Sequence, residues 1–345
     1  MGRWNRCPSG PSRTTCSPSS CSPTSLSSLI GTSSWLGRAC HLIGGPAGRR
    51  PGEPRRFGPG AVGQDGPVTS PLNPSVIAEL VVLAENLARE AGSLVRDGRP
   101  GRVDVAATKS SAVDVVTAAD LASETLLRRR IAEARPDDAI LGEEGGLLAG
   151  TSEVTWVLDP IDGTVNYLYG IPAYAVSVAA VVGPPDPAGW TVVAGCVHAV
   201  ADGRTWTAGL GTGAFLDGER LTANEARPLS ESLLGTGFGY RAERRRSQGR
   251  VIAEVLPQVR DIRRIGSAAM DICTLANGGL DVYFERGLNP WDLAAASLVA
   301  LEAGAVVTGL RGAPAGTGMT VVGPAQTVAT LVDLLERLDA DAGDD

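Results

Sequence analysis

The sequence predicts a layered α/β fold that contains long antiparallel β-strand runs. Some segments repeat apolar residues at three- and four-residue spacing, which is typical of amphipathic helices. Others are short runs of β-branched and apolar residues bounded by turn residues, which indicate strands. Strand signals follow one another through residues 139–216, and helices and strands mix only later. This order differs from the regular strand–helix–strand repeat of a purely parallel sheet.

The first predicted element is a helix that begins after Asn73. Asn73 can cap its N-terminus, Pro74 suits its first turn, and Gly98 is expected to end it. Its predicted apolar stripe consists of Ile77, Leu80, Ala84, Leu87, Ala91 and Leu94.

A second helix is expected over about residues 121–134, with Leu127 and Ile131 facing inward. It must stop before Pro136. Strands are then predicted at 139–141, 155–158, 174–182, 191–197, 204–207 and 214–216. Glycines between the last two strands indicate a hairpin rather than a dinucleotide loop.

The C-terminal half mixes both kinds of element. Helices are expected near 245–256, 267–277, 291–303 and 325–338, and strands near 282–284, 306–308 and 320–322. The arginine-rich run 241–250 is interpreted as a solvated helix face or its entry, with a partner site or an anionic-ligand site as the alternative.

Charge divides the chain of 345 residues into two parts. The net charge is -7, and residues 1–72 contribute +6 with eight arginines and two acids, so residues 73–345 carry -13. Phosphate backbones are contacted by clustered Lys and Arg, so an acidic body is a poor nucleic-acid binder. No stretch approaches the ~18 apolar residues of a membrane span. Neither a nucleic-acid nor a membrane partner is therefore expected.

Residues 1–72 are rich in Ser, Pro, Gly and Arg and lack helical or strand periodicity, which predicts disorder. A basic organellar leader and an over-extended gene start, with a true start near Val68, both fit this segment. The remaining chain is expected to form one catalytic domain over 73–340, with sub-regions of about 73–225 and 226–340. Its two cysteines, Cys196 and Cys273, are expected to be buried, and a reducing cytoplasm is the expected compartment.

The densest group of polar residues lies at 156–164. An apolar strand is predicted to end at Asp159, Pro160 to break the ladder, and Gly163 with Thr164 to open a short helix after Asp162. Two carboxylates beside free backbone N–H groups can hold a hard cation together with a phosphate. A plain turn is the alternative, because Asp, Pro and Gly are turn residues.

Three further segments support a site. Glu143 and Glu144 stand between glycines after a strand, Asp292 follows Pro-Trp at a helix start, and Asp120 closes a segment that begins at Lys109. Each has an ordinary explanation: a solvated turn, an acid stabilised by the helix dipole, or a first-turn acid. Their joint presence indicates a metal site.

These segments resemble the inositol monophosphatase family of magnesium-dependent, lithium-sensitive phosphatases. The motifs that carry the resemblance lie at 109–120, 142–145, 159–164, 264–269, 283–285 and 291–296. The resemblance covers about residues 74–338 and is strongest to the bacterial inositol-1-monophosphatases. It implies an alternating α/β/α/β/α layered sandwich, a homodimer, two to three Mg²⁺ ions and inhibition by Li⁺.

The resemblance also implies roles for individual residues. Metal ligands would be Glu143, Asp159, the carbonyl of Ile161, Asp162 and Asp292, with Asp159 bridging two ions and Glu143 helping to hold a third. Catalytic roles would fall to Glu143, Thr164, Asp120 and Lys109: Thr164 orients the attacking water, Asp120 supports it and Lys109 adds positive charge. Substrate contacts would come from Asp162, Gly163, Thr164, Ala268 and Glu285.

The chemistry expected is hydrolysis of a small phosphorylated polyol by metal-activated water. A covalent nucleophile is not required, because the body contains one histidine, His198, expected in the core or on the surface, and no Cys-x5-Arg loop. The residues after Thr164, Val165-Asn166-Tyr167, resemble the inositol-specific branch, so myo-inositol 1-phosphate is the expected substrate. Histidinol phosphate, fructose 1,6-bisphosphate and adenosine 3′,5′-bisphosphate remain alternatives, as does a non-catalytic regulatory or binding protein on this fold.

Overall fold

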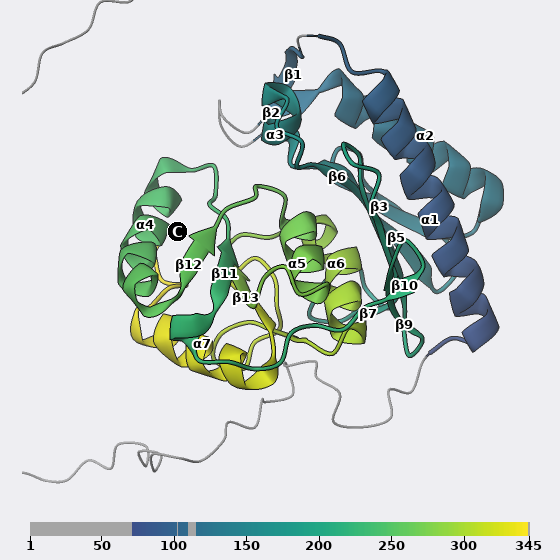
Figure 1. Ribbon diagram of the computed structural model, residues 1–345. Helices are drawn as coiled ribbons and strands as arrows, with labels where there is room; N and C mark the ends of the chain where they lie inside the picture. The colour runs from purple at the N-terminus through teal and green to yellow at the C-terminus, as the bar shows by residue number, and fades with distance from the viewer. Residues whose placement is uncertain (1–70, 102, 110–114, 344–345) are drawn as a thin grey trace, which may run out of the picture. The chain divides into compact units, whose positions relative to one another are not determined.

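The protein is built around a mixed β-sheet with strand order β10-β9-β8-β7-β6-β5-β3-β4 (Figure 1). The structure is a computed structural model that describes residues 71–101, 103–109 and 115–343. The strands are β3 (Ala139–Gly142), β4 (Gly146–Leu148), β5 (Val154–Asp162), β6 (Ala175–Val182), β7 (Thr191–Ala199), β8 (Thr205–Gly209), β9 (Gly213–Leu216) and β10 (Glu219–Arg220). All neighbours are antiparallel except β3 and β5, which run parallel. The predicted antiparallel run is confirmed, as is the hairpin that joins β8 to β9.

Two helices cover one face of this sheet, α1 (Pro74–Asp97) and α2 (Ala118–Ala134). Helix α1 begins as predicted, because the side chain of Asn73 accepts a hydrogen bond from the backbone N–H of Ser75. The predicted stripe is wrong at its last position: Leu94 is exposed and Val95 is buried. A period of 3.6 residues places the fourth residue after Ala91, and not the third, on the buried face.

The second sheet has strand order β12-β11-β13-β15-β14. Its strands are β11 (Leu233–Thr236), β12 (Asp261–Arg263), β13 (Val282–Glu285), β14 (Val306–Thr308) and β15 (Thr320–Gly323). Helices α5 (Ala268–Ala276) and α6 (Pro290–Glu302) are almost wholly apolar and pack together against the first sheet, and α5 also contacts β11 and β13.

Helices α4 (Ala242–Val255) and α7 (Ala325–Arg337) share a third apolar cluster with the second sheet. The layers therefore alternate as helix, sheet, helix, sheet and helix, which confirms the predicted fold class (Figure 1). The boundary between the two sheets lies between β10 and β11, although α6 packs on the first sheet. The proposed sub-regions stay a prediction.

The predicted end of the strand at Asp159 is wrong. Strand β5 continues through Pro160 to Asp162, and its register against β6 shifts between Asp159 and Asp162. A bulge of this kind accommodates a proline and redirects side chains without ending the strand. The short helix expected next is present as α3 (Thr164–Tyr169).

Several short strands were not expected from the sequence. They are β4, β10, β11 and β12, and the two-stranded pair of β1 (Val105–Thr108) with β2 (Val115–Thr117). Each has two to four residues, too few to display an alternating pattern. Helix α2 also begins earlier than expected, because Thr117 and Asp120 form its capping box.

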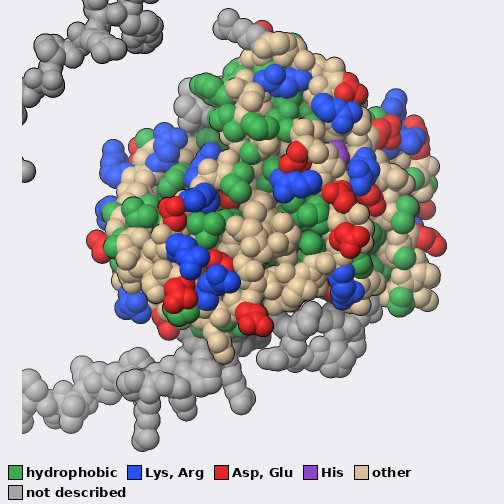
Figure 2. All heavy atoms as spheres, viewed as in Figure 1, with side chains coloured by type: hydrophobic (Ala, Val, Ile, Leu, Met, Phe, Trp, Pro, Cys, Tyr) green, Lys and Arg blue, Asp and Glu red, His purple; other side chains and the backbone are tan. Residues whose placement is uncertain are grey.

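The other expectations concern single side chains. Cys196 and Cys273 are buried free thiols, and His198 is buried with its Nδ1 2.8 Å from the Thr205 hydroxyl, as a core role predicts. Most arginines of 241–250 are exposed on or just before α4, but Arg244 is half-buried. Lys and Arg side chains are interspersed with Asp and Glu on the face drawn in Figure 2.

Two predictions fall wholly or partly on residues outside those that the structure describes. The disorder expected for residues 1–72 falls almost wholly outside the described residues, as does the 110–114 portion of the segment that begins at Lys109. Among the helices that the structure describes, none has the length and apolar character needed to cross a bilayer.

Candidate active site

A polar pocket of about 350 Å³ opens between the end of β5, the turn after β3 and the N-terminal ends of α5 and α6. All the site residues predicted from the sequence except Asp120 line it: Lys109, Glu143, Asp159, Ile161, Asp162, Gly163, Thr164, Ala268, Glu285 and Asp292. Asp120 lies one contact away, hydrogen-bonded to Thr164. Segments more than 180 positions apart in the sequence thus meet at one cavity of a size that accepts a small ligand.

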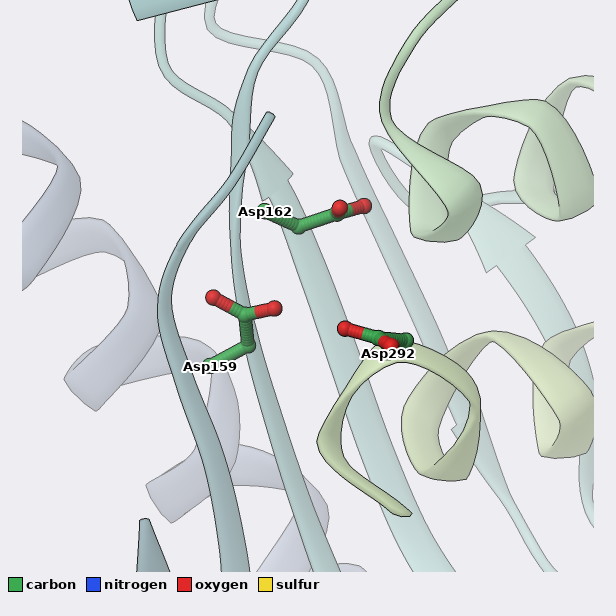
Figure 3. A group of neighbouring side chains, drawn as sticks. All are labelled: Asp159, Asp162 and Asp292. Carbon is green, nitrogen blue, oxygen red and sulfur yellow. The ribbon is translucent and has the colours of Figure 1, made fainter. Parts of the chain in front are cut away.

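Three carboxylates converge within this pocket. Asp159 and Asp162 come from the bulged end of β5, and Asp292 from the first turn of α6 (Figure 3). One oxygen of each lies within 4.8 Å of the others. Asp292 also completes a capping box, because its Oδ2 accepts the backbone N–H of Asn289 at 2.7 Å. The carboxylate that caps α6 is therefore also a member of the acidic group in the pocket.

Burial and mutual repulsion govern the protonation of these acids. Burial, followed by the charges of Glu143, Asp162 and Asp292, raises the pKa of Asp159 well above its usual range. Burial and the charges of Glu143 and Asp162 do the same for the pKa of Asp292. A bound cation would stabilise the ionised form of these carboxylates, because it supplies a positive charge beside them. Because all donors are oxygens, the set fits a hard divalent cation such as Mg²⁺.

Glu143 lies in the turn that joins β3 to β4. Lys109 Nζ lies 2.6 Å from Glu143 Oε1 and 2.7 Å from Glu144 Oε1. Burial raises the pKa of Glu143 to about 7 although Lys109 opposes this. Burial disfavours the ammonium, but both carboxylates outweigh it and raise the pKa of Lys109. The ammonium of Lys109, predicted to add positive charge, therefore forms an ion pair with Glu143, which is a candidate metal ligand.

Asp162 is held by the start of α5. Its Oδ2 accepts a 2.6 Å hydrogen bond from the Ser267 hydroxyl and a 2.7 Å bond from the backbone N–H of Ala269. Burial raises the pKa of Asp162, and these two donors oppose that rise. The start of α5 therefore fixes this carboxylate at the wall of the pocket.

Thr164 opens helix α3 beside the acids. Its hydroxyl lies 3.0 Å from Oδ1 of Asp120 and 2.9 Å from the carbonyl oxygen of Ile161. Gly163, which precedes it, has a φ of 94°, and a Cβ there would lie 2.9 Å from the carbonyl oxygen of Ala173. The turn therefore requires glycine, and its backbone lies at the pocket wall.

Glu285 lines the pocket from the end of β13. Its Oε2 accepts a 2.5 Å hydrogen bond from the buried hydroxyl of Tyr283. Burial raises the pKa of Glu285 to about 7, and the Tyr283 bond opposes that rise. Gly237 faces it closely, because a Cβ there would lie 2.0 Å from Oε2. This carboxyl is suited to accept hydrogen bonds from hydroxyl groups.

Sequence reasoning missed residues that support the site. Ser267 and Tyr283 each hold a predicted site carboxylate. Ser267 is the N-cap of α5, and both residues lie in the motifs 264–269 and 283–285, but neither was assigned a role of its own from the sequence. Four arginines that were not predicted as site residues also line the pocket: Arg241, Arg244, Arg264 and Arg286. The first two belong to the arginine-rich run 241–250, for which an anionic-ligand site is the alternative interpretation.

A group of acidic oxygens in a polar pocket fits the metal-assisted hydrolysis of a phosphate ester. The sequence model of the inositol monophosphatase family matches residues 77–337. The chain therefore belongs to the inositol monophosphatase family, whose members include phosphoric monoester hydrolases.

Individual relatives agree with this family. Inositol-1-monophosphatase SuhB of Mycobacterium tuberculosis is 48% identical over 281 residues, which cover 76% of this chain and 95% of the relative. Nus factor SuhB of Vibrio cholerae is 36% identical over 232 residues, 67% of this chain and 85% of the relative. The solved structure of Mycobacterium tuberculosis SuhB has a TM-score of 0.64 at 44% identity and covers 77% of this chain and 98% of its own.

Proposed function

We propose that this protein hydrolyses the phosphate monoester of a small polyol, with myo-inositol 1-phosphate as its preferred substrate and Mg²⁺ as its cofactor. The convergence of Asp159, Asp162 and Asp292 carries this proposal. Three carboxylates in one place can hold a divalent cation, and such a cation supplies the positive charge that polarises a phosphate ester. The names of the mycobacterial relatives support the choice of substrate.

The metal would be held by Asp159, Asp162, Asp292, Glu143 and the carbonyl oxygen of Ile161. When bound, divalent cations supply Lewis-acid polarisation of phosphoryl oxygens and activation of water. All five groups line the pocket. The raised pKa values of Asp159 and Asp292 support the same assignment, because crowded buried acids need a countercharge.

The protein's own groups would orient the substrate. Backbone N–H groups at Gly163 and Thr164 would bind the phosphate, together with Asp162 through the metal site, and the hydroxyl of Thr164 would orient the attacking water. Asp120 would hold that hydroxyl, to which it is already hydrogen-bonded. Lys109 would hold Glu143 and add positive charge. Glu285 and the backbone at Ala268 would contact the polyol hydroxyls across the pocket.

The experiment is phosphate release in Mg²⁺ with four substrates in parallel. These are inositol 1-phosphate, histidinol phosphate, fructose 1,6-bisphosphate and adenosine 3′,5′-bisphosphate. We expect the highest kcat/KM for inositol 1-phosphate and inhibition by millimolar Li⁺. A preference for another substrate would contradict the inositol assignment but keep the metal site.

A regulatory function is the second candidate, and the name of the Vibrio cholerae relative, a Nus factor, favours considering it. Retention of the complete carboxylate set together with Thr164 favours catalysis, because a binding protein has no chemical need for it. Absence of phosphate release from all four substrates would favour the regulatory candidate. We also propose a homodimer in a reducing cytoplasm; the buried free thiols of Cys196 and Cys273 are compatible with that compartment.

A further inference from the structure

The turn that joins β3 to β4, residues 143–145, contains Glu143 and is called here the Glu143 turn. Helix α2 binds this turn through a buried carboxylate that the proposed chemistry does not use. Glu124 is 3% exposed. Its Oε2 accepts the backbone N–H of Glu144 and its Oε1 that of Gly145, both at 2.8 Å. A carboxylate that accepts two successive backbone N–H groups fixes the path of the chain at that point.

Arg128, one helical turn further along α2, completes this clamp. Its Nε donates to Glu124 Oε1 at 2.7 Å, and one of its terminal nitrogens donates to the carbonyl oxygen of Gly146 at 2.6 Å. The pair therefore binds three consecutive residues, which begin directly after Glu143.

The two glycines of the Gly-Glu-Glu-Gly motif are explained by this contact. A Cβ at Gly142 would lie 2.4 Å from Glu124 Oε1, and a Cβ at Gly145 would lie 2.7 Å from the same atom. Neither glycine has a positive φ, so backbone conformation does not require them. They leave the space through which the Glu124 carboxylate reaches the turn.

The same face of α2 contacts two other parts of the pocket. Asp120 accepts the Thr164 hydroxyl, and the hydroxyl of Ser123 donates to the carbonyl oxygen of Pro160, inside the β5 bulge, at 3.1 Å. Positions 120, 123, 124 and 128 share one helical face. One rigid helix thus contacts the bulge, the Thr164 hydroxyl and the Glu143 turn.

We propose that Glu124 is a positioning residue for the metal site. By binding the residues that follow Glu143, it fixes the position and direction of the Glu143 side chain relative to Asp159. This inference rests on the proposed function, because it assigns Glu143 a role toward a divalent cation. Glu124 itself touches neither substrate nor reacting atoms. Its effect should therefore appear in the affinity for the metal before it appears in the affinity for the polyol.

The test compares Glu124→Gln with wild-type protein and with Glu133→Gln, an exposed position on the same helix. The substituted amide keeps the shape of the side chain but offers one acceptor oxygen to three surrounding donors. Mg²⁺ affinity is measured by calorimetry on the substrate-free protein, and kcat and KM at saturating Mg²⁺. Supporting residues around metal ligands typically change metal affinity by about 10–100-fold. We expect about tenfold weaker Mg²⁺ binding in the Glu124 variant, with KM close to wild type, and no change in the Glu133 variant.

A second variant approaches the same contact from the turn. Gly145→Ala inserts a Cβ against the Glu124 carboxylate and leaves α2 intact, so it should also weaken Mg²⁺ binding. Combined with Glu124→Ala, which vacates that space, its effect should be less than additive. Unchanged Mg²⁺ affinity in both single variants, with only a lower Tm, would show a merely structural role and overturn the inference. Failure of the wild-type protein itself to bind Mg²⁺ would overturn both this inference and the proposed function.

Discussion

Asp120 and Thr164, 44 positions apart in the sequence, share a 3.0 Å hydrogen bond behind the pocket wall. Asp120 is itself fixed by the backbone N–H of Thr117 at 2.8 Å. Burial raises the pKa of Asp120, and the hydrogen bonds from Thr117 and Thr164 oppose this. The side chain of Asp120, which belongs to the capping box of α2, thus also holds the hydroxyl of Thr164, the first residue of α3.

This relationship predicts distinct outcomes for two substitutions of Thr164. Thr164→Ser keeps the hydroxyl between Asp120 and the Ile161 carbonyl, so most activity should remain. Thr164→Val keeps the shape but removes the hydroxyl, and kcat should fall by about 10²–10⁴, the usual contribution of a positioned proton-transfer group. Steady-state phosphate release measures both. Near-wild-type kcat in the valine variant would exclude a role for this hydroxyl.

A second prediction concerns Asp159, at the centre of the acidic cluster. Asp159→Asn removes one buried acid that its neighbours Glu143, Asp162 and Asp292 repel. In the presence of a chelator the variant should therefore melt at or above the wild-type Tm. Addition of Mg²⁺ should raise the wild-type stability by about 2.7 kcal/mol at a concentration of 100 Kd, but the variant very little, and turnover should be abolished. Equal Mg²⁺-dependent Tm shifts in both proteins would contradict the metal assignment.

Much of the site could be predicted because its residues cluster in short motifs. Asp159, Asp162 and Thr164 lie within six positions, and Asp120 and Asp292 stand at helix starts that have their own capping signals. The fold class was also predictable, because long strands and amphipathic helices display their periods.

The remaining contacts join segments that are distant in the sequence. Ser267 holds Asp162 across 105 positions, and Glu124 binds the turn about 20 positions later, inside a helix where a glutamate is an ordinary surface residue. Strands β11 and β12 are short and depend on parallel neighbours from elsewhere in the chain. No local pattern encodes such pairings, since tertiary packing decides them.

The third prediction addresses substrate recognition through Tyr283 and Glu285. Tyr283→Phe removes the hydroxyl that donates to Glu285 Oε2, so the carboxyl loses its fixed direction. We expect KM for the polyol to rise about tenfold, which corresponds to about 1.4 kcal/mol of lost binding, while kcat changes little. Tyr169→Phe, at an exposed tyrosine, is the matched control. A fall in kcat without a change in KM would contradict a substrate-binding role for Glu285.

The fourth prediction is a pH dependence of stability that arises from Asp271. This acid is 1% exposed in α5, its Oδ1 has no hydrogen-bond partner among the described residues, and burial, aided by the charges of Glu285 and Asp162, raises its pKa to about 8. Between its ordinary pKa near 4 and about 8, the folded protein keeps a proton that the unfolded chain has lost. Stability must therefore fall as pH rises through this window.

Asp271→Asn should remove this dependence, because the amide carries no charge at any pH. In the presence of a chelator, the variant and the wild-type protein should be closest in stability near pH 4. The variant should then gain on the wild type by up to about 1.4 kcal/mol for each pH unit up to about pH 8. Urea unfolding at several pH values measures the difference, with Asp186→Asn, at an exposed loop position, as the control. A difference between variant and wild type that stays constant from pH 4 to 8.5 would show that Asp271 does not titrate in this range. The buried carboxyl would then hold the same protonation state in the folded and the unfolded protein.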